Sequence, residues 1–184
     1  MTEISLNILD VAQNSVKANA SLIELLVGID TVKDTLTVRI NDNGHGMSRE
    51  QLERVTDPFF TTRDTRSVGL GVPFFKDAAE STGGSFCITS QEGEGTQVCA
   101  VFGLSHIDRA PLGDMNATVE MLVFYNTHID FLYKYSVNDG EFALDTREIK
   151  ELLEGAPLDA PDVKAFISEF LKENSAEVNK GRIF

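Results

Sequence analysis

The sequence predicts an α+β fold, a two-layer sandwich whose mixed or antiparallel sheet carries helices on one face. Residues 5–19 place apolar side chains at helical spacing, while residues 22–29, 36–40, 85–90 and 97–102 alternate apolar and polar side chains as strands do. Short polar or glycine-rich turns connect these strands in pairs. Elements with one apolar face are stable when that face is buried against a second layer, which gives the sandwich.

The N-terminal elements have recognisable boundaries. The first pair of strands flanks a polar turn over residues 30–34. A short helix is predicted after Ser48, because Ser48 and Gln51 have the spacing of a capping box. The next helix is expected to begin near Gly71 and to stop at Gly83, and the second pair of strands follows it.

Residues 105–184 are predicted to form a small α/β appendage, which divides the chain into domains 1–104 and 105–184. The appendage is predicted to contain, in order, a linker at residues 111–114, an apolar segment at 119–124, a hairpin around Asn138-Asp139-Gly140, a helix from Asp145 to near Gly155, and an amphipathic helix from Pro161 to Lys172. No catalytic motif is recognisable within it.

Composition limits the classes of function. The chain of 184 residues has a formal net charge of -13, and acidic residues outnumber basic ones in both halves. This argues against a nucleic-acid partner, because Lys and Arg supply most of that affinity. No apolar run is long enough to cross a membrane, and the N-terminus lacks the features of a signal peptide, so a cytoplasmic protein is expected.

The cysteines and histidines do not indicate a metal site. Cys87 and Cys99 lie in alternating segments and are expected to be small core residues rather than a disulfide or metal pair. The three histidines show no metal-ligand spacing.

Four segments in order suggest a function. They read LDVAQNSVK at residues 9–17, DNGHGM at 42–47, DPFFTTR with VGLG between residues 57 and 71, and GEGT at 93–96. This set resembles the nucleotide-binding motifs of the GHKL superfamily, which includes gyrase, Hsp90-type chaperones, histidine kinases and mismatch-repair ATPases. The resemblance implies the Bergerat type of sandwich over residues 4–104 and a site for ATP or ADP with Mg²⁺.

The first segment supplies a helix face. Asp10 precedes Asn14 by one helical turn, and Lys17 follows on the same side. The resemblance implies that Asn14 binds the metal that bridges the phosphates, and that Lys17 meets phosphate. Asp10 occupies the place of the general base in the ATPase branches, and a structural carboxylate or a carboxylate supporting the metal remains the alternative.

The second and fourth segments are expected to hold the base. Asp42 can accept a hydrogen bond from an exocyclic amine, which adenine has and guanine lacks at that position. Gly44 and Gly46 are expected to let the backbone pass close to the base and ribose. Thr96 resembles the family threonine whose hydroxyl reaches the same edge of adenine.

The third segment is expected to hold the phosphates. Gly69, Leu70 and Gly71 precede a helix, whose first N–H groups favour an anion. Thr62 and Arg63 lie just before them in a segment that the resemblance identifies as a short ATP lid.

The segment that begins at His106 partly resembles a phosphoacceptor site. His106, Arg109, Pro111 and Leu112 match the offsets of the phosphoacceptor box of histidine kinases. That box normally has an acid where Ile107 stands and precedes the ATP domain, so a linker histidine is favoured.

The resemblance leaves three activities open. The chain is expected to be a cytoplasmic protein kinase or phosphotransfer component that acts on a His or Ser of a protein partner. The alternatives are an ATPase switch and a non-catalytic regulatory module that binds ATP or ADP. The sequence does not determine the oligomeric state, and a homodimer is one of the states that remain open.

Overall fold

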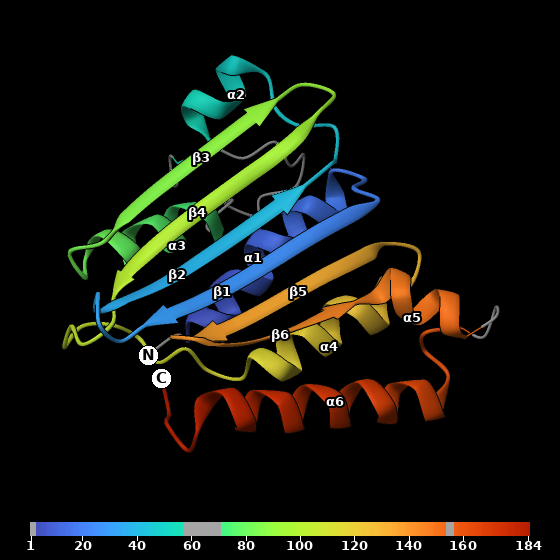
Figure 1. Cartoon of the computed structure of the whole chain (residues 1–184). Coiled ribbons are helices and arrows are strands. Elements are labelled where there is room, and N and C mark those ends of the chain that lie inside the picture. Colours follow the sequence, from blue (N-terminus) through green and yellow to red (C-terminus); the bar gives the residue numbers. More distant parts are fainter. Residues whose placement is uncertain (1–2, 57–70, 154–156) are drawn as a thin grey trace.

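The computed structural model describes residues 3–56, 71–153 and 157–184. In chain order the elements are α1 (Ile4–Lys17), β1 (Leu22–Asp30), β2 (Thr35–Asp42), α2 (Arg49–Arg54), α3 (Gly71–Glu80), β3 (Ser85–Gln91), β4 (Gly95–Gly103), α4 (Met115–Tyr125), β5 (Asp130–Val137), β6 (Gly140–Asp145), α5 (Thr146–Leu152) and α6 (Pro161–Asn179). The strands form one six-stranded sheet in the order β3-β4-β2-β1-β5-β6, with α1, α3 and α4 layered on one face (Figure 1). The predicted α+β sandwich is confirmed.

Residues 105–184 extend the same sheet. The hairpin of β5 and β6 forms around Asn138, as predicted, and β5 then pairs in parallel with β1, so that Ile23 lies beside Phe131. Every other strand pair is antiparallel. The hairpin signal indicated two paired strands but did not indicate the neighbour to which they would attach.

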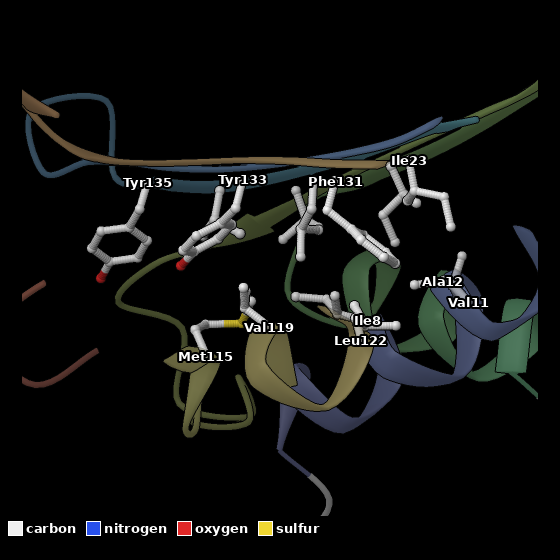
Figure 2. Packing of buried hydrophobic residues seen from close by; sticks show 14 of the residues in the cluster. Ile8, Val11, Ala12, Ile23, Met115, Val119, Leu122, Phe131, Tyr133 and Tyr135 are labelled. Carbon is white, nitrogen blue, oxygen red and sulfur yellow. The ribbon is translucent and has the colours of Figure 1, made fainter. Parts of the chain in front are cut away.

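The core lies between the sheet and its helices. Side chains of β1 alternate between buried and partly exposed positions, because successive residues of a strand point to opposite faces. Figure 2 shows Phe131 and Tyr133 of β5 pointing from the sheet towards Val119 and Leu122 of α4, beside Ile8 of α1. One hydrophobic cluster therefore includes residues from both parts of the chain.

The prediction that Cys87 and Cys99 are core residues is wrong. Cys87 is exposed and Cys99 is partly buried, and both thiols are free. Their neighbours Val98 and Ala100 occupy the helix-covered face of β4, and period-two alternation then places Cys99 on the open face. The two cysteines are direct partners across β3 and β4.

Helix α6 continues to Asn179, beyond the predicted end at Lys172. Val178 extends its buried stripe, and the Asn179 side-chain oxygen accepts a hydrogen bond of 2.8 Å from the Tyr135 hydroxyl. The helix ends where Lys180 adopts a left-handed conformation. In the part of the chain that the structure describes, neither α6 nor any other helix is long and apolar enough to cross a membrane.

Residues near 111 join the two ends of the described chain. The amide N–H groups of Ile4 and Ser5 donate to the carbonyl oxygens of Pro111 and Leu112, and the Leu112 N–H donates to the Phe184 carbonyl. The two ends therefore lie side by side (Figure 1). His106, upstream of this junction, is an exposed residue outside any helix.

Candidate functional site

Helix α1 carries the first group of predicted site residues on its outer side. Ile8 and Val11 are buried on its inner side, whereas the side chains of Asp10, Asn14 and Lys17 are exposed. Positions separated by three or four residues share one helix face. The structure therefore presents a carboxylate, an amide and an ammonium group along one exposed stripe that ends at the C-terminus of α1.

The N-terminus of α3 lies against this stripe. A Cβ atom added at Gly71 would lie 3.2 Å from the Cβ of Asp10. The first turn of a helix leaves backbone N–H groups without intrahelical partners, and these groups favour an anion. Gly71 thus allows α3 to begin beside Asp10, which brings the first and third motifs together.

Asp42 is held at the end of β2 by two donors. Ser15 Oγ, from the buried side of α1, donates to Asp42 Oδ2 at 2.5 Å. The Gly44 N–H donates to Asp42 Oδ1 at 2.9 Å. The carboxylate is partly buried and fixed from both sides, which prepares it to accept a further hydrogen bond from a ligand.

The glycines of the second motif fit the protein's own backbone. A Cβ at Gly44 would lie 2.8 Å from both the Cβ and the carbonyl oxygen of Ala18, at the end of α1. Gly46 has a φ of +65°, and a Cβ there would collide with the Gln91 carbonyl oxygen. In the described residues, the end of α1 and the end of β3 lie close to these two glycines, and the expected approach of the base and ribose stays a prediction.

Thr96 lies beside Asp42 as its direct partner across β4 and β2. The Thr96 hydroxyl is 2.9 Å from the Ser90 hydroxyl, which also accepts a 2.9 Å hydrogen bond from the Met47 N–H. Ser90 thereby joins the loop after Asp42 to the hairpin that carries Thr96. The second and fourth motifs meet at this end of the sheet.

Four predicted site residues lie outside the described residues. They are Thr62, Arg63, Gly69 and Leu70, together with the rest of the expected lid. The structure places Asp10 beside Gly71 and Asp42 beside Thr96, and Ser15 of α1 links the helix to Asp42. The phosphate-side contacts expected of the lid stay predictions.

The described residues offer few candidate ligands for a metal ion. Among residues 3–56, 71–153 and 157–184, no group of three or more His, Cys, Asp or Glu side chains is arranged to hold a metal ion. Magnesium bound to phosphates takes most of its oxygen ligands from those phosphates and from water. Asn14 offers one exposed amide oxygen on the outer side of α1, and its role as a metal ligand stays a prediction.

Sequence reasoning missed two residues that shape the site. Ser15 orients Asp42, and Ser90 contacts Thr96. Ser15 directly follows Asn14, but nothing in a single sequence shows that a buried helix serine faces a strand end. Ser90 stands six residues before Thr96, and the Gly-rich turn between them would have placed the two side by side once the hairpin register was fixed.

Known proteins are similar to the N-terminal part of the chain. Residues 2–106 match the family described as histidine kinase-, DNA gyrase B-, and HSP90-like ATPase. The sensor protein DegM of Bacillus sp. is 31% identical over 91 residues, which cover 50% of this chain and 24% of that protein. Sporulation kinase D of Bacillus subtilis is 30% identical over 98 residues, which cover 53% of this chain and 19% of that kinase. The chain thus matches about a quarter or less of the length of these relatives.

A solved structure shows the same fold. The N-terminal domain of a DNA repair protein superposes with a TM-score of 0.54 over 79% of this chain and 53% of that one, at 14% sequence identity. This similarity concerns the fold alone. The family match over residues 2–106 covers more than half of the sequence, and it shows that the chain belongs to the histidine kinase-, DNA gyrase B- and HSP90-like ATPase family.

Proposed function

We propose that the chain binds Mg-ATP and transfers the terminal phosphoryl group to a protein partner. The observation that supports nucleotide binding most directly is Asp42, whose two oxygens each accept a hydrogen bond from the protein and which lies beside Thr96. A fixed carboxylate at that place selects an amine and disfavours a carbonyl, because a carboxylate only accepts hydrogen bonds. Adenine is therefore the proposed base.

The phosphate side of the proposed site lies between α1 and α3. Asn14 would hold the magnesium ion, which neutralises phosphate charge when bound, and Lys17 would contact phosphate. In the proposed transfer, Asp10 accepts the proton of the attacking hydroxyl while that oxygen bonds to the terminal phosphorus. The bond from phosphorus to the bridging oxygen breaks, and ADP leaves.

All of these proposed contacts lie within residues 1–104, so we assign the nucleotide-binding domain to that range. Residues 105–184 are proposed as an extension whose strands cover the edge of β1. The relatives DegM and sporulation kinase D are named as a sensor protein and a kinase, which favours a role in phosphotransfer to a protein.

Hydrolysis is the second candidate, and the exposed position of Asp10 beside the start of α3 favours it. The same carboxylate would activate a water molecule in place of a partner hydroxyl. Incubation with γ-labelled ATP and magnesium separates the candidates: a labelled partner from a lysate supports the kinase, and free phosphate without one supports the ATPase switch. Binding without either product indicates a regulatory module.

Calorimetry tests the site itself. Asp42→Asn is expected to weaken ADP binding by about tenfold or more, because it removes a charge-assisted hydrogen bond. Asp77→Asn is the matched control, an exposed carboxylate on α3 that should leave ADP binding unchanged. Equal affinities for ADP and GDP in the parent protein would contradict the role of Asp42, and no binding of any nucleotide would contradict the proposed function.

A further inference from the structure

Ser90 makes three hydrogen bonds with one hydroxyl group. Ser90 Oγ is 2.9 Å from the Gly95 carbonyl oxygen, 2.9 Å from the Met47 amide nitrogen and 2.9 Å from Thr96 Oγ1. Ser90 and Thr96 are direct partners across β3 and β4, so their side chains share one face of the sheet. That face is the helix-covered one, where Asp42 also lies as the partner of Thr96.

Only one arrangement of protons satisfies all three contacts. A carbonyl oxygen only accepts, so the single Ser90 proton must go to Gly95. An amide N–H only donates, so Ser90 Oγ accepts from Met47. The remaining contact is formed only if the Thr96 hydroxyl donates its proton to Ser90 Oγ. The Thr96 oxygen can then accept a hydrogen bond from a ligand, but its proton is already donated to Ser90.

Asp42, the neighbour of Thr96, also presents acceptor atoms at this place. Its Oδ2 accepts a hydrogen bond from the Ser15 hydroxyl, and its Oδ1 accepts one from the Gly44 N–H. Asp42 and Thr96 thus form an edge that accepts hydrogen bonds and donates none. Such an edge favours a ligand group that has two N–H protons to donate. A carbonyl oxygen at the same place would meet only the lone pairs of Asp42 and Thr96, which disfavours it.

We propose that Ser90 is a positioning residue that sets base selectivity by holding the Thr96 proton away from the ligand. The ligand group it selects is the exocyclic amine of adenine, in preference to the carbonyl of hypoxanthine at the same position. Without the Ser90 hydroxyl, the Thr96 hydroxyl is free to rotate and to donate to a carbonyl. The inference rests on the proposed nucleotide site and adds to it a residue outside the motif positions assigned above.

The test compares ADP and inosine diphosphate, both with magnesium, by calorimetry. The parent protein is expected to prefer ADP, and Ser90→Ala is expected to narrow that preference by about fivefold, the equivalent of one neutral hydrogen bond. Ser90→Thr keeps a hydroxyl in the strand and is expected to restore the parent ratio. Thr89→Ala is the matched control, because Thr89 is the exposed neighbour on the opposite face of β3.

A double-mutant cycle distinguishes an effect of Ser90 on Thr96 from general damage to the hairpin. Thr96→Val removes the hydroxyl that Ser90 orients, so Ser90→Ala should change the ADP to inosine diphosphate ratio in the parent background but not in the Thr96→Val background. Circular dichroism checks that each variant is folded. A Ser90→Ala variant that loses affinity for both nucleotides equally, or keeps the parent ratio, overturns the role of Ser90 while nucleotide binding stands. A parent protein that binds neither nucleotide overturns the proposed function and this inference with it.

Discussion

At the scale of single residues, Asp10 determines whether the proposed site does chemistry. Its side chain is exposed on α1 and lies next to Gly71 at the start of α3. Asp10→Asn keeps the shape of the side chain, so ADP and Mg-ATP are expected to bind as in the parent. Phosphate release or transfer is expected to fall by about a hundredfold, the usual contribution of a positioned base.

Steady-state turnover and calorimetry on the same Asp10→Asn preparation separate these effects. Asp77→Asn again serves as control, since it removes a comparable exposed charge from α3. Unchanged turnover would make Asp10 a structural carboxylate, and a loss of binding would assign it to the metal.

Tyr133 offers a prediction about stability. Its hydroxyl is fully buried and, among the described residues, is the buried side-chain polar atom that lacks a hydrogen-bond partner. Burial raises the pKa of Tyr133 well above its ordinary value, so the group stays protonated and neutral. Tyr133→Phe is expected to raise the free energy of unfolding by about 1 kcal/mol, because an unpaired buried hydroxyl costs about that much or more.

Tyr135 is the matched comparison. Its hydroxyl donates to Asn179 at 2.8 Å, so Tyr135→Phe is expected to lower the free energy of unfolding by about 1 kcal/mol. Urea unfolding of both variants gives the two values. A Tyr133→Phe protein that is as destabilised as Tyr135→Phe would mean that an ordered water satisfies the Tyr133 hydroxyl.

The residues of the site differ in how far the sequence alone predicts them. Asp42 and Asn14 stand inside short motifs whose spacing is local, so their placement at a strand end and on a helix face followed from the sequence. Ser15 and Ser90 act through contacts between distant elements. Serine is common and small, and no local pattern separates a serine that orients a carboxylate from one that faces solvent.

At the scale of elements, Gly46 fixes the loop between β2 and α2 against the end of β3. It has a positive φ, and its missing Cβ leaves room for the Gln91 carbonyl. Gly46→Ala is therefore expected to destabilise the protein in two ways. A left-handed alanine costs about 1 kcal/mol on its own, and the collision of its Cβ with the backbone adds to that cost. We expect a clear loss of thermal stability together with weaker ADP binding, because the displaced loop carries Met47 and follows Asp42.

Gly93 separates the collision from the conformational strain. It has a φ of +80° in the turn between β3 and β4, and nothing lies within 4 Å of where its Cβ would be. Gly93→Ala should therefore lose about 1 kcal/mol and keep ADP binding. Thermal melts of the two variants in parallel test whether the collision at Gly46 adds to the conformational strain. Equal losses of thermal stability would show that the contact with Gln91 is easily relieved.

Element boundaries were predicted best where a side chain caps or turns the backbone locally. The capping box of Ser48 and Gln51 forms as expected at the start of α2, and Asp145 caps α5. The face of the sheet to which each strand residue points was harder to predict, because a one-residue change of phase reverses every side chain. Cys87 and Cys99 accordingly lie on the open face and not in the core. The attachment of β5 to β1 depends on a pairing between distant segments, for which a single sequence carries no local signal.

At the scale of the whole molecule, the two parts of the chain share one core. Without residues 105–184, β1 would become an edge strand, and α1 would lose its packing against α4. A chain ending at residue 104 is therefore expected to aggregate or to unfold without a cooperative transition. Size-exclusion chromatography and urea unfolding check this.

Addition of residues 105–184 as a second polypeptide is the control for the shortened chain. If the loss comes from the uncovered edge of β1, co-expression of the two pieces should recover a soluble complex with cooperative unfolding. A monomeric chain of residues 1–104 that unfolds cooperatively by itself would show that the parallel pairing adds little to the stability of the nucleotide-binding part.

The parallel pairing of β1 with β5 also bears on how the protein is made. Ile23 is translated long before Phe131, its neighbour in the finished sheet. At a synthesis rate of about 5–20 residues per second, β1 waits on the order of 5–20 s on the ribosome before its partner strand exists. Contacts so distant in sequence also close slowly once the chain is free. Throughout that interval, the edge of β1 that later pairs with β5 has unpaired backbone groups, which other nascent chains can contact. We therefore expect the nascent chain to depend on chaperones during its synthesis.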